Sequence, residues 1–233
     1  IDAANRTFSR NYAERVIHPY LIRQNIRHLD VLALSHPHGD HIGGAPYLLE
    51  NISIGEIWEP QVQGKSKTFR QYHDLADSLK VPIRNIYAGD FFNFGDCDLY
   101  VLHPSRNYIK TNPQSYNHYS TVIKLSYNET DILFTGDIEG EDENYVALFG
   151  NFLESEILKV PHHGSGTSSS DTFIQAVTPD IAFVSVGWRN KYNHPSQQKM
   201  ERYVNSGTKL YRSDRHHALN ILSDGKKIKI LEY

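Results

Sequence analysis

The sequence is poor in cysteine, which limits what can hold the fold together. Cys97 is the only cysteine among 233 residues, so no disulfide can form within the chain and cysteine usage indicates no redox compartment. A domain of this length can bury roughly 70–75% of the surface of its unfolded chain without such a bridge. We therefore expect an ordinary hydrophobic core. At Cys97 the sequence favours a quiet, buried thiol, and the alternatives are a bridge to a partner or a free thiol.

Long apolar runs are also missing. No stretch of 18 or more apolar residues occurs, which argues against a membrane-spanning helix, and no signal-peptide pattern is visible. The chain starts at Ile1 without Met, and Ile1-Asp2 is predicted to be the end of a strand. We expect a domain cut from something longer, or a processed product.

Repeats, low-complexity stretches and Pro/Ser linkers are absent as well, which favours a single domain over residues 1–233. Apolar runs typical of strands alternate with helical patterns, and this mixture predicts an α/β fold in which helices cover sheets. Predicted helices cover residues 10–25, with Pro19 bending or restarting the first, and 43–50, 68–80, 141–149, 171–177 and 196–205. Predicted strands cover 29–35, 54–58, parts of 83–103, 121–127, 132–135, 157–160, 181–186, 209–212, 218–222 and 227–231.

Polar motifs follow four of these strands directly. LALS precedes His36, ILFT precedes Gly136-Asp137, ILKV precedes Pro161-His162-His163, and AFVSV precedes Gly187. Loops at strand ends are positioned by a rigid sheet, and binding and catalytic residues concentrate there. We therefore expect the functional site at these loops.

The densest motif is HPHGDH, which places His36, His38, Asp40 and His41 within six residues. Imidazole nitrogen and carboxylate oxygen are ligands that suit zinc, manganese and iron. In an extended or looped backbone His36 and His38 point the same way, because side chains alternate, and Asp40 can reach a second ion. The alternative is a polar surface loop, which the density of ligand-type side chains disfavours. Three glycines allow a tight backbone path and close approach: Gly39, Gly43 and Gly44.

The run His-x-His-x-Asp-His after an apolar strand resembles the signature of metallo-β-lactamase-fold hydrolases. Gly136-Asp137 and His162-His163-Gly164-Ser165 resemble later blocks of the same fold. The resemblance implies an α/β protein of αββα four-layer architecture. Because Ile1-Asp2 resembles the end of an early strand, it also implies that the first strand pair is absent or precedes the chain.

The resemblance further implies two divalent metal ions, zinc or manganese. One ion would be held by His36, His38 and His118, and the other by Asp40, His41 and His162, with Asp137 bridging. Two positions have alternatives: relatives are often Asn-rich around His118, and His163 is adjacent to His162, which is favoured because it lies nearer the strand end. Asp2 is expected to orient a ligand histidine.

Five blocks together are similar, in order and in span, to the soluble domain of the ComEC family of competence DNA-uptake channel proteins. These blocks are LALSHPHGDHIGG, TGDIEGE, LKVPHHGSGTSSS, SVGWRNKYNHP and YRSD. The resemblance implies a nuclease at the extracytoplasmic face of the bacterial inner membrane. Its partners would be single-stranded DNA and the membrane channel portion of the same protein.

In such a nuclease, two ions hold a shared hydroxide that attacks phosphorus in line. Asp40, Asp137 and His194 are the residues expected to carry the chemistry, His194 either as an acid for the leaving oxygen or as a phosphate contact. A structural role for His194 is the alternative. The residues expected to contact the substrate are His163, Ser165, Arg189, Lys191 and His194.

Charge is distributed unevenly along the chain. Residues 1–158 carry 13 Lys and Arg against 21 Asp and Glu, whereas residues 159–233 carry 11 against 6. This fits either ordinary variation in surface charge or a basic face for an anionic substrate.

Two other functions stay open. One is a hydrolase of a small lactone, thioester or phosphodiester, since the fold does not determine the substrate. The other is a catalytically silent domain that guides DNA.

Overall fold

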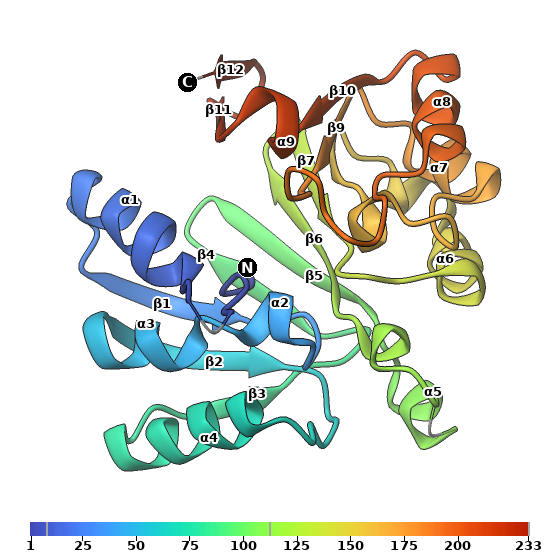
Figure 1. The fold of residues 1–233 in the computed structure, drawn as a ribbon. Coiled ribbons are helices and arrows are strands. Elements are labelled where there is room, and N and C mark those ends of the chain that lie inside the picture. Colours follow the sequence, from blue (N-terminus) through green and yellow to red (C-terminus); the bar gives the residue numbers. More distant parts are fainter. Residues whose placement is uncertain (8, 112, 233) are drawn as a thin grey trace. The chain divides into compact units, whose positions relative to one another are not determined.

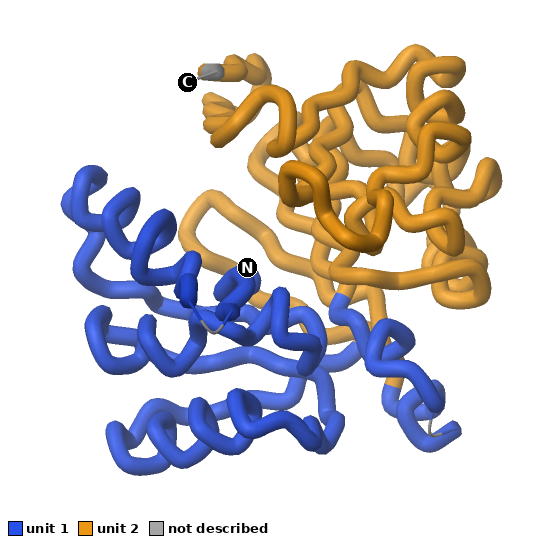
Figure 2. The backbone as a smooth tube through the Cα atoms, in the orientation of Figure 1, with its two compact units in different colours: residues 1–87, 106–121 blue, residues 88–105, 122–233 orange. Residues whose placement is uncertain are grey.

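The computed structural model describes residues 1–7, 9–111 and 113–232. Its helices and strands are labelled in Figure 1. The chain divides into two compact units, which Figure 2 colours separately. Unit 1 comprises residues 1–87 and 106–121, and unit 2 comprises residues 88–105 and 122–233. Among the described residues, no helix has the length and apolar character needed to cross a bilayer.

Unit 1 is built on a three-stranded parallel sheet in the order β1-β2-β3. Its strands are β1 (His28–Ala33), β2 (Ser53–Glu59) and β3 (Ile83–Asn85). Its helices are η1 (Ala13–Ile17), α1 (His18–Arg23), α2 (Gly39–Ile42), α3 (Ala45–Asn51), α4 (Lys67–Leu79), α5 (Arg106–Lys110) and η2 (Tyr116–Tyr119). The connections from β1 to β2 and from β2 to β3 both move across the sheet in the same direction. Because such connections are right-handed, they place α3 and α4 on the same face of the sheet. These two helices contact each other (Figure 1).

Unit 2 contains a seven-stranded mixed sheet in the order β10-β9-β8-β7-β6-β5-β4. Strands β4 (Phe91–Phe94), β5 (Cys97–His103), β6 (Val122–Tyr127) and β7 (Thr130–Phe134) form an antiparallel meander. Strands β8 (Ile157–Lys159), β9 (Ile181–Val184) and β10 (Lys209–Arg212) continue parallel to β7. A separate hairpin pairs β11 (Leu219–Ser223) with β12 (Ile228–Glu232).

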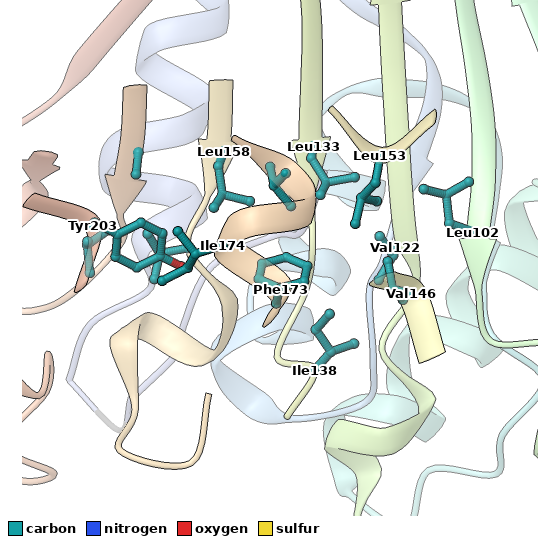
Figure 3. Close-up of a cluster of buried hydrophobic side chains, with 14 of the residues drawn as sticks. Leu102, Val122, Leu133, Ile138, Val146, Leu153, Leu158, Phe173, Ile174 and Tyr203 are labelled. Atoms are coloured by element: carbon teal, nitrogen blue, oxygen red, sulfur yellow. The ribbon is translucent and has the colours of Figure 1, made fainter. Parts of the chain in front are cut away.

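The helices of unit 2 connect its parallel strands. Helices α6 (Gly140–Ala147), α7 (Asp171–Val177) and α8 (Gln197–Asn205) lie in three successive crossovers and pack against one another in sequence order. Short turns η3 (Gly150–Leu153), η4 (Pro161–Gly164) and α9 (Ser213–His216) lie in the connections. The core between sheet and helices joins Leu133 and Leu158 of the strands to Phe173 of α7 and Tyr203 of α8 (Figure 3).

The structure confirms the predicted α/β class and most predicted elements. The first predicted helix is interrupted, because α1 starts at His18 with Pro19 in its first turn, where proline is tolerated. Helix α5 was not predicted. The predicted strand end at Ile1-Asp2 is wrong, since Asp2 has a φ of 60°, which lies outside the extended region. The prediction of a single domain stays a prediction.

Candidate metal centre

The ligand-type residues of unit 1 lie just after strand β1, whose last two residues are buried. We call His36, His38, Asp40 and His41 the N-terminal cluster. The backbone is extended at His38, with φ −72° and ψ 148°, and α2 begins at the next residue. His36 and His41 are buried, His38 is half-buried and Asp40 is exposed. One strand end and one helical turn therefore present four donors within a single short segment.

The rings of His36 and His38 converge on one point. Nε2 of His36 lies 2.9 Å from Nδ1 of His38. Two nitrogens bound to one tetrahedral zinc at 2.0–2.1 Å would lie about 3.4 Å apart. The pair is thus close to the spacing that a shared metal ion requires, and these residues fit the metal that the sequence predicted.

Hydrogen bonds with Ser35 and Asp2 determine which ring nitrogen carries the proton in His36 and in His41. The Ser35 hydroxyl donates to Oδ2 of Asp2 at 3.0 Å, so toward Nδ1 of His36, at 3.1 Å, it can only accept. Nδ1 of His41 donates to Oδ2 of Asp2 at 2.8 Å. In both histidines the proton therefore sits on Nδ1, which leaves Nε2 with the lone pair that a metal ion needs.

Asp2 is held as a carboxylate at this position. Burial alone would raise the pKa of Asp2, but the His41 ring and the hydrogen bond from the Ser35 backbone N–H hold that pKa well below its usual range. A charged carboxylate is the stronger acceptor for the His41 ring. Asp2 therefore contacts a predicted ligand histidine, as the sequence suggested.

Two glycines allow the N-terminal segment to reach this position. A Cβ atom on Gly43 would lie 2.4 Å from the Arg6 nitrogen, and one on Gly44 would lie 2.2 Å from the Ala3 oxygen. No side chain fits at either distance, so the predicted close approach is confirmed for both. A Cβ on Gly39 would meet nothing within 4 Å, so close approach of the backbone does not explain the glycine at that position.

The segment that carries His118 lies beside the N-terminal cluster. The Tyr116 ring packs edge-on against the His38 ring, with centroids 5.6 Å apart. The Thr121 N–H donates to the Ser35 carbonyl at 2.9 Å. Turn η2 is thus fixed to the same strand end as the cluster, and His118 as a ligand stays a prediction.

The ligand-type residues of unit 2 come from three separate loops. We call Asp137, Glu139, His162, His163 and His194 the C-terminal cluster. The loops follow β7, β8 and β9, which are parallel neighbours. Since the carboxyl ends of parallel strands share one edge of a sheet, these loops meet there.

Asp137 is the buried centre of the C-terminal cluster. Its Oδ2 lies 3.4 Å from Nε2 of His163, and its Oδ1 lies 3.7 Å from the Lys159 ammonium. Lys159 is itself fixed by donating to the Gly136 carbonyl at 2.9 Å. The lysine therefore partly balances the charge of the carboxylate.

The two adjacent histidines point in different directions. His162 and His163 both have left-handed backbone, with φ of 45° and 53°, a conformation that costs non-glycine residues about 1–3 kcal/mol each and concentrates at functional sites. Nδ1 of His162 pairs with Oε1 of Glu139 at 2.7 Å. Nδ1 of His163 donates to the Ser185 carbonyl at 2.6 Å.

This orientation makes His163 the better candidate ligand. With its Nδ1 proton given to a carbonyl, a neutral His163 ring presents its Nε2 lone pair to the Asp137 carboxylate. Two lone-pair atoms that face each other are stabilised by a cation between them. His162 has its partner in Glu139 and turns toward His194 instead, with ring centroids 5.6 Å apart.

The other predicted substrate contacts lie in two loops of unit 2. Burial, together with the neighbouring His162 and His163 rings, lowers the pKa of His194. Arg189 and Lys191 lie in the same loop as His194, and both are exposed. Ser165 is buried and its hydroxyl bonds to that of Thr167 at 2.9 Å.

Sequence reasoning did not identify Glu139, Lys159 or the Ser185 carbonyl. Glu139 lies two residues after Asp137 in TGDIEGE, and Lys159 immediately precedes the VPHH motif. Both lie in blocks that the sequence analysis singled out, so their positions were a usable signal. Nothing in the sequence marks a backbone carbonyl as a partner.

A family model described as "Metallo-beta-lactamase superfamily" matches residues 5–108 and 110–188. The chain belongs to this superfamily. Among solved structures, it resembles the metallo-β-lactamase fold protein YhfI of Bacillus subtilis, with a TM-score of 0.56 and 12% identity over 96% of this chain and 84% of that one. It also resembles CmlA, a diiron β-hydroxylase from Streptomyces venezuelae, with a TM-score of 0.54 and 12% identity over 89% and 45% of the two chains. These likenesses show the fold alone.

Closer in sequence are proteins of bacterial competence. The chain is 30% identical to ComE operon protein 3 of Bacillus subtilis over 87% of this chain and 26% of that protein. It is 32% identical to competence protein ComA of Neisseria gonorrhoeae over 89% of this chain and 27% of that protein. The chain thus spans about a quarter of the length of these relatives. It is a hydrolase-like domain with competence-related homologues, in a fold that implies divalent metal binding.

Proposed function

We propose that the chain is a metal-dependent phosphodiesterase domain that cleaves DNA. The observation that carries the metal is the convergence of His36 Nε2 and His38 Nδ1 to 2.9 Å, beside a His41 ring fixed by Asp2. The observation that favours DNA is the competence-related naming of the relatives. An ion-binding hydrolase with such relatives is best explained as a nuclease.

The proposed ligands are those that the family resemblance assigns, with one change. Two divalent ions, zinc or manganese, would lower the pKa of water and neutralise phosphate charge. The first would be held by His36, His38 and His118, and the second by Asp40, His41 and His163, with Asp137 shared. His163 replaces His162 because its ring, not that of its neighbour, faces the Asp137 carboxylate.

The remaining residues of the two clusters position these ligands. Asp2 and the Ser185 carbonyl each hold a histidine by its Nδ1 proton, so that neither ring rotates away. Lys159 partly balances the charge of Asp137. His194 is placed by its loop beside His162, and we assign it to the leaving oxygen or to a phosphate oxygen of the substrate.

We further propose that Arg189 and Lys191 bind the phosphate backbone of single-stranded DNA. Both belong to the basic C-terminal third of the chain, and cations that contact phosphates release counterions. Two wider proposals follow from the relatives alone. The domain would act during DNA uptake, attached to a membrane channel portion of its parent protein, and it would face the extracytoplasmic side of the inner membrane.

The test is hydrolysis of labelled single-stranded DNA by the metal-free domain after addition of manganese or zinc, compared with a lactone and a thioester. We expect metal-dependent cleavage of DNA alone. Replacing Arg189 and Lys191 with alanine should lower the slope of log affinity against log salt by about one unit per lost phosphate contact. The matched control is Lys226→Ala with Lys227→Ala, in the turn between β11 and β12. Preferred turnover of the lactone or thioester would instead identify a small-molecule hydrolase.

A further inference from the structure

The loop between β9 and α8 exposes two large aromatic rings. Trp188 is 71% exposed and Tyr192 is 63% exposed. Rings of this size usually bury most of their surface in a core or an interface, where they contribute much of the binding energy. The loop therefore presents two apolar flat surfaces that the rest of unit 2 leaves mostly exposed.

Each ring has a cation beside it. The Arg189 guanidinium lies 5.7 Å from the Trp188 ring centroid, and the Lys191 ammonium lies 4.9 Å from that of Tyr192. The sequence WRNKY thus alternates flat apolar surfaces with positive charges. Unpaired nucleic acid has the complementary pattern, in which flat bases alternate with negative phosphates.

The loop is held in shape by one side chain. The Asn190 amide nitrogen donates to the carbonyls of Gly187 and His194 at 3.1 and 2.7 Å. Its amide oxygen accepts from the backbone N–H groups of Tyr192 and His194 at 3.2 and 3.0 Å. Four hydrogen bonds to the backbone fix the loop before any ligand arrives, which lowers the entropy cost of binding.

A row of rings leads from this loop to the C-terminal cluster. The Tyr192 ring stacks on His194, with centroids 5.7 Å apart and an interplanar angle of 21°. His194 in turn packs edge-on against His162 at 5.6 Å. A base stacked on this loop would therefore place its neighbouring phosphate near residues to which we assign the substrate.

We propose that Trp188 and Tyr192 form a stacking platform for unpaired bases, with Arg189 and Lys191 on the adjacent phosphates. The inference rests on the proposed function, since the bound strand is the substrate of that site. Stacking on aromatic rings accepts any base, because every base has a π-face, but it requires that the face be free. In a duplex both faces are covered by neighbours, so the platform selects single strands over duplexes without reading sequence.

The protein contains a natural reporter of this contact. It has two tryptophans, of which Trp58 is only 1% exposed and Trp188 is 71% exposed. Titration with a phosphorothioate-linked 20-mer of deoxythymidine, which resists hydrolysis, should quench the emission of Trp188. The Trp188→Phe variant should lose this quenching while keeping most of its affinity, because a phenyl ring still stacks.

The decisive comparison uses a strand without bases. We expect wild-type protein to bind the 20-mer more tightly than an abasic 20-mer with the same backbone, and more tightly than a blunt duplex. Trp188→Ala and Tyr192→Ala should each weaken binding of the 20-mer by about 5- to 150-fold and leave binding of the abasic strand almost unchanged. Phe91→Ala, which removes another exposed ring of unit 2, is the matched control and should bind both strands as wild type does.

Equal affinity of the wild-type protein for the two strands would overturn the platform. A second result would also overturn it: neither strand quenches the emission of Trp188, and anionic lipid vesicles shift that emission to the blue. Aromatic rings with adjacent cations also suit a membrane surface. Hydrolysis is measured separately with bis(4-nitrophenyl) phosphate, which has no base to stack. If the protein does not hydrolyse this compound but still prefers the 20-mer to the abasic strand, the proposed function is refuted and the stacking platform is supported.

Discussion

The two donor clusters of this protein are built in opposite ways. The N-terminal cluster lies within six consecutive residues after one strand, and the rings of His36 and His41 are fixed by two side chains, those of Ser35 and Asp2. The C-terminal cluster is collected from three loops, and its key ring is fixed by a backbone carbonyl, that of Ser185. The first can be recognised as a motif, whereas the second exists only because three parallel strands end at one edge.

The clusters also differ in the unusual backbone geometry that each of them requires. In the N-terminal cluster, close packing of backbone against Gly43 and Gly44 brings Asp2 into place. In the C-terminal cluster, the backbone of His162 and His163 is left-handed. The neighbouring Gly164 has a φ of 76°, and a Cβ atom there would lie 2.6 Å from Pro195. Each of the following experiments asks whether the clusters contribute to one chemistry despite this difference.

The largest effect is expected from Asp137→Ala. This change removes the carboxylate at the centre of the C-terminal cluster, and DNA hydrolysis should fall by at least about 10²–10³-fold, as when a single charge-stabilising group is lost. Circular dichroism and thermal unfolding should show a folded domain. Unchanged turnover of the purified variant would exclude Asp137 from the reaction.

A second experiment distinguishes the adjacent histidines. His163→Ala should weaken metal binding by at least about 10–100-fold, since even an outer partner of a metal ligand contributes that much. His162→Ala, the matched control with the same loss of a ring, should retain metal near the wild-type level. Metal content and affinity are measured by titration calorimetry and elemental analysis. The reverse result would assign the ligand role to His162, as the sequence analysis favoured.

A third and smaller effect is expected from Asp2→Asn. The amide keeps the shape of the side chain but loses the charge that fixes the His41 ring, so metal affinity should fall by about 10-fold. Asp30→Asn, in the same unit at an exposed position, should leave affinity unchanged. Equal affinities of the two variants would show that Asp2 does not orient a ligand.

The smallest effect is a shift in thermal stability. Ions that bind only the folded protein at about 100 times their dissociation constant stabilise it by about 2.7 kcal/mol. For a chain of this size that corresponds to roughly 5–10 °C in Tm. Differential scanning fluorimetry with and without a chelator measures the shift. A Tm that ignores both chelator and added manganese or zinc would contradict the metal site itself.

The sequence by itself determined the α/β class, most of the helices and strands, and the N-terminal cluster. These depend on local patterns: the apolar runs that form β1 and β7, the proline in the first turn of α1, and ligand-type side chains two residues apart in one motif. The periodicity of side chains is a property of the backbone and needs no partner from elsewhere in the chain.

Only the tertiary structure decided how the C-terminal cluster is arranged. The ring that faces Asp137 belongs to His163, although sequence favoured its neighbour, because a left-handed backbone turns the two rings apart. Asp2 reaches His41 across 39 positions of the chain, and Ser185 reaches His163 across 22. Contacts between residues so distant in sequence depend on which strands are neighbours and where they end, and no local pattern encodes that.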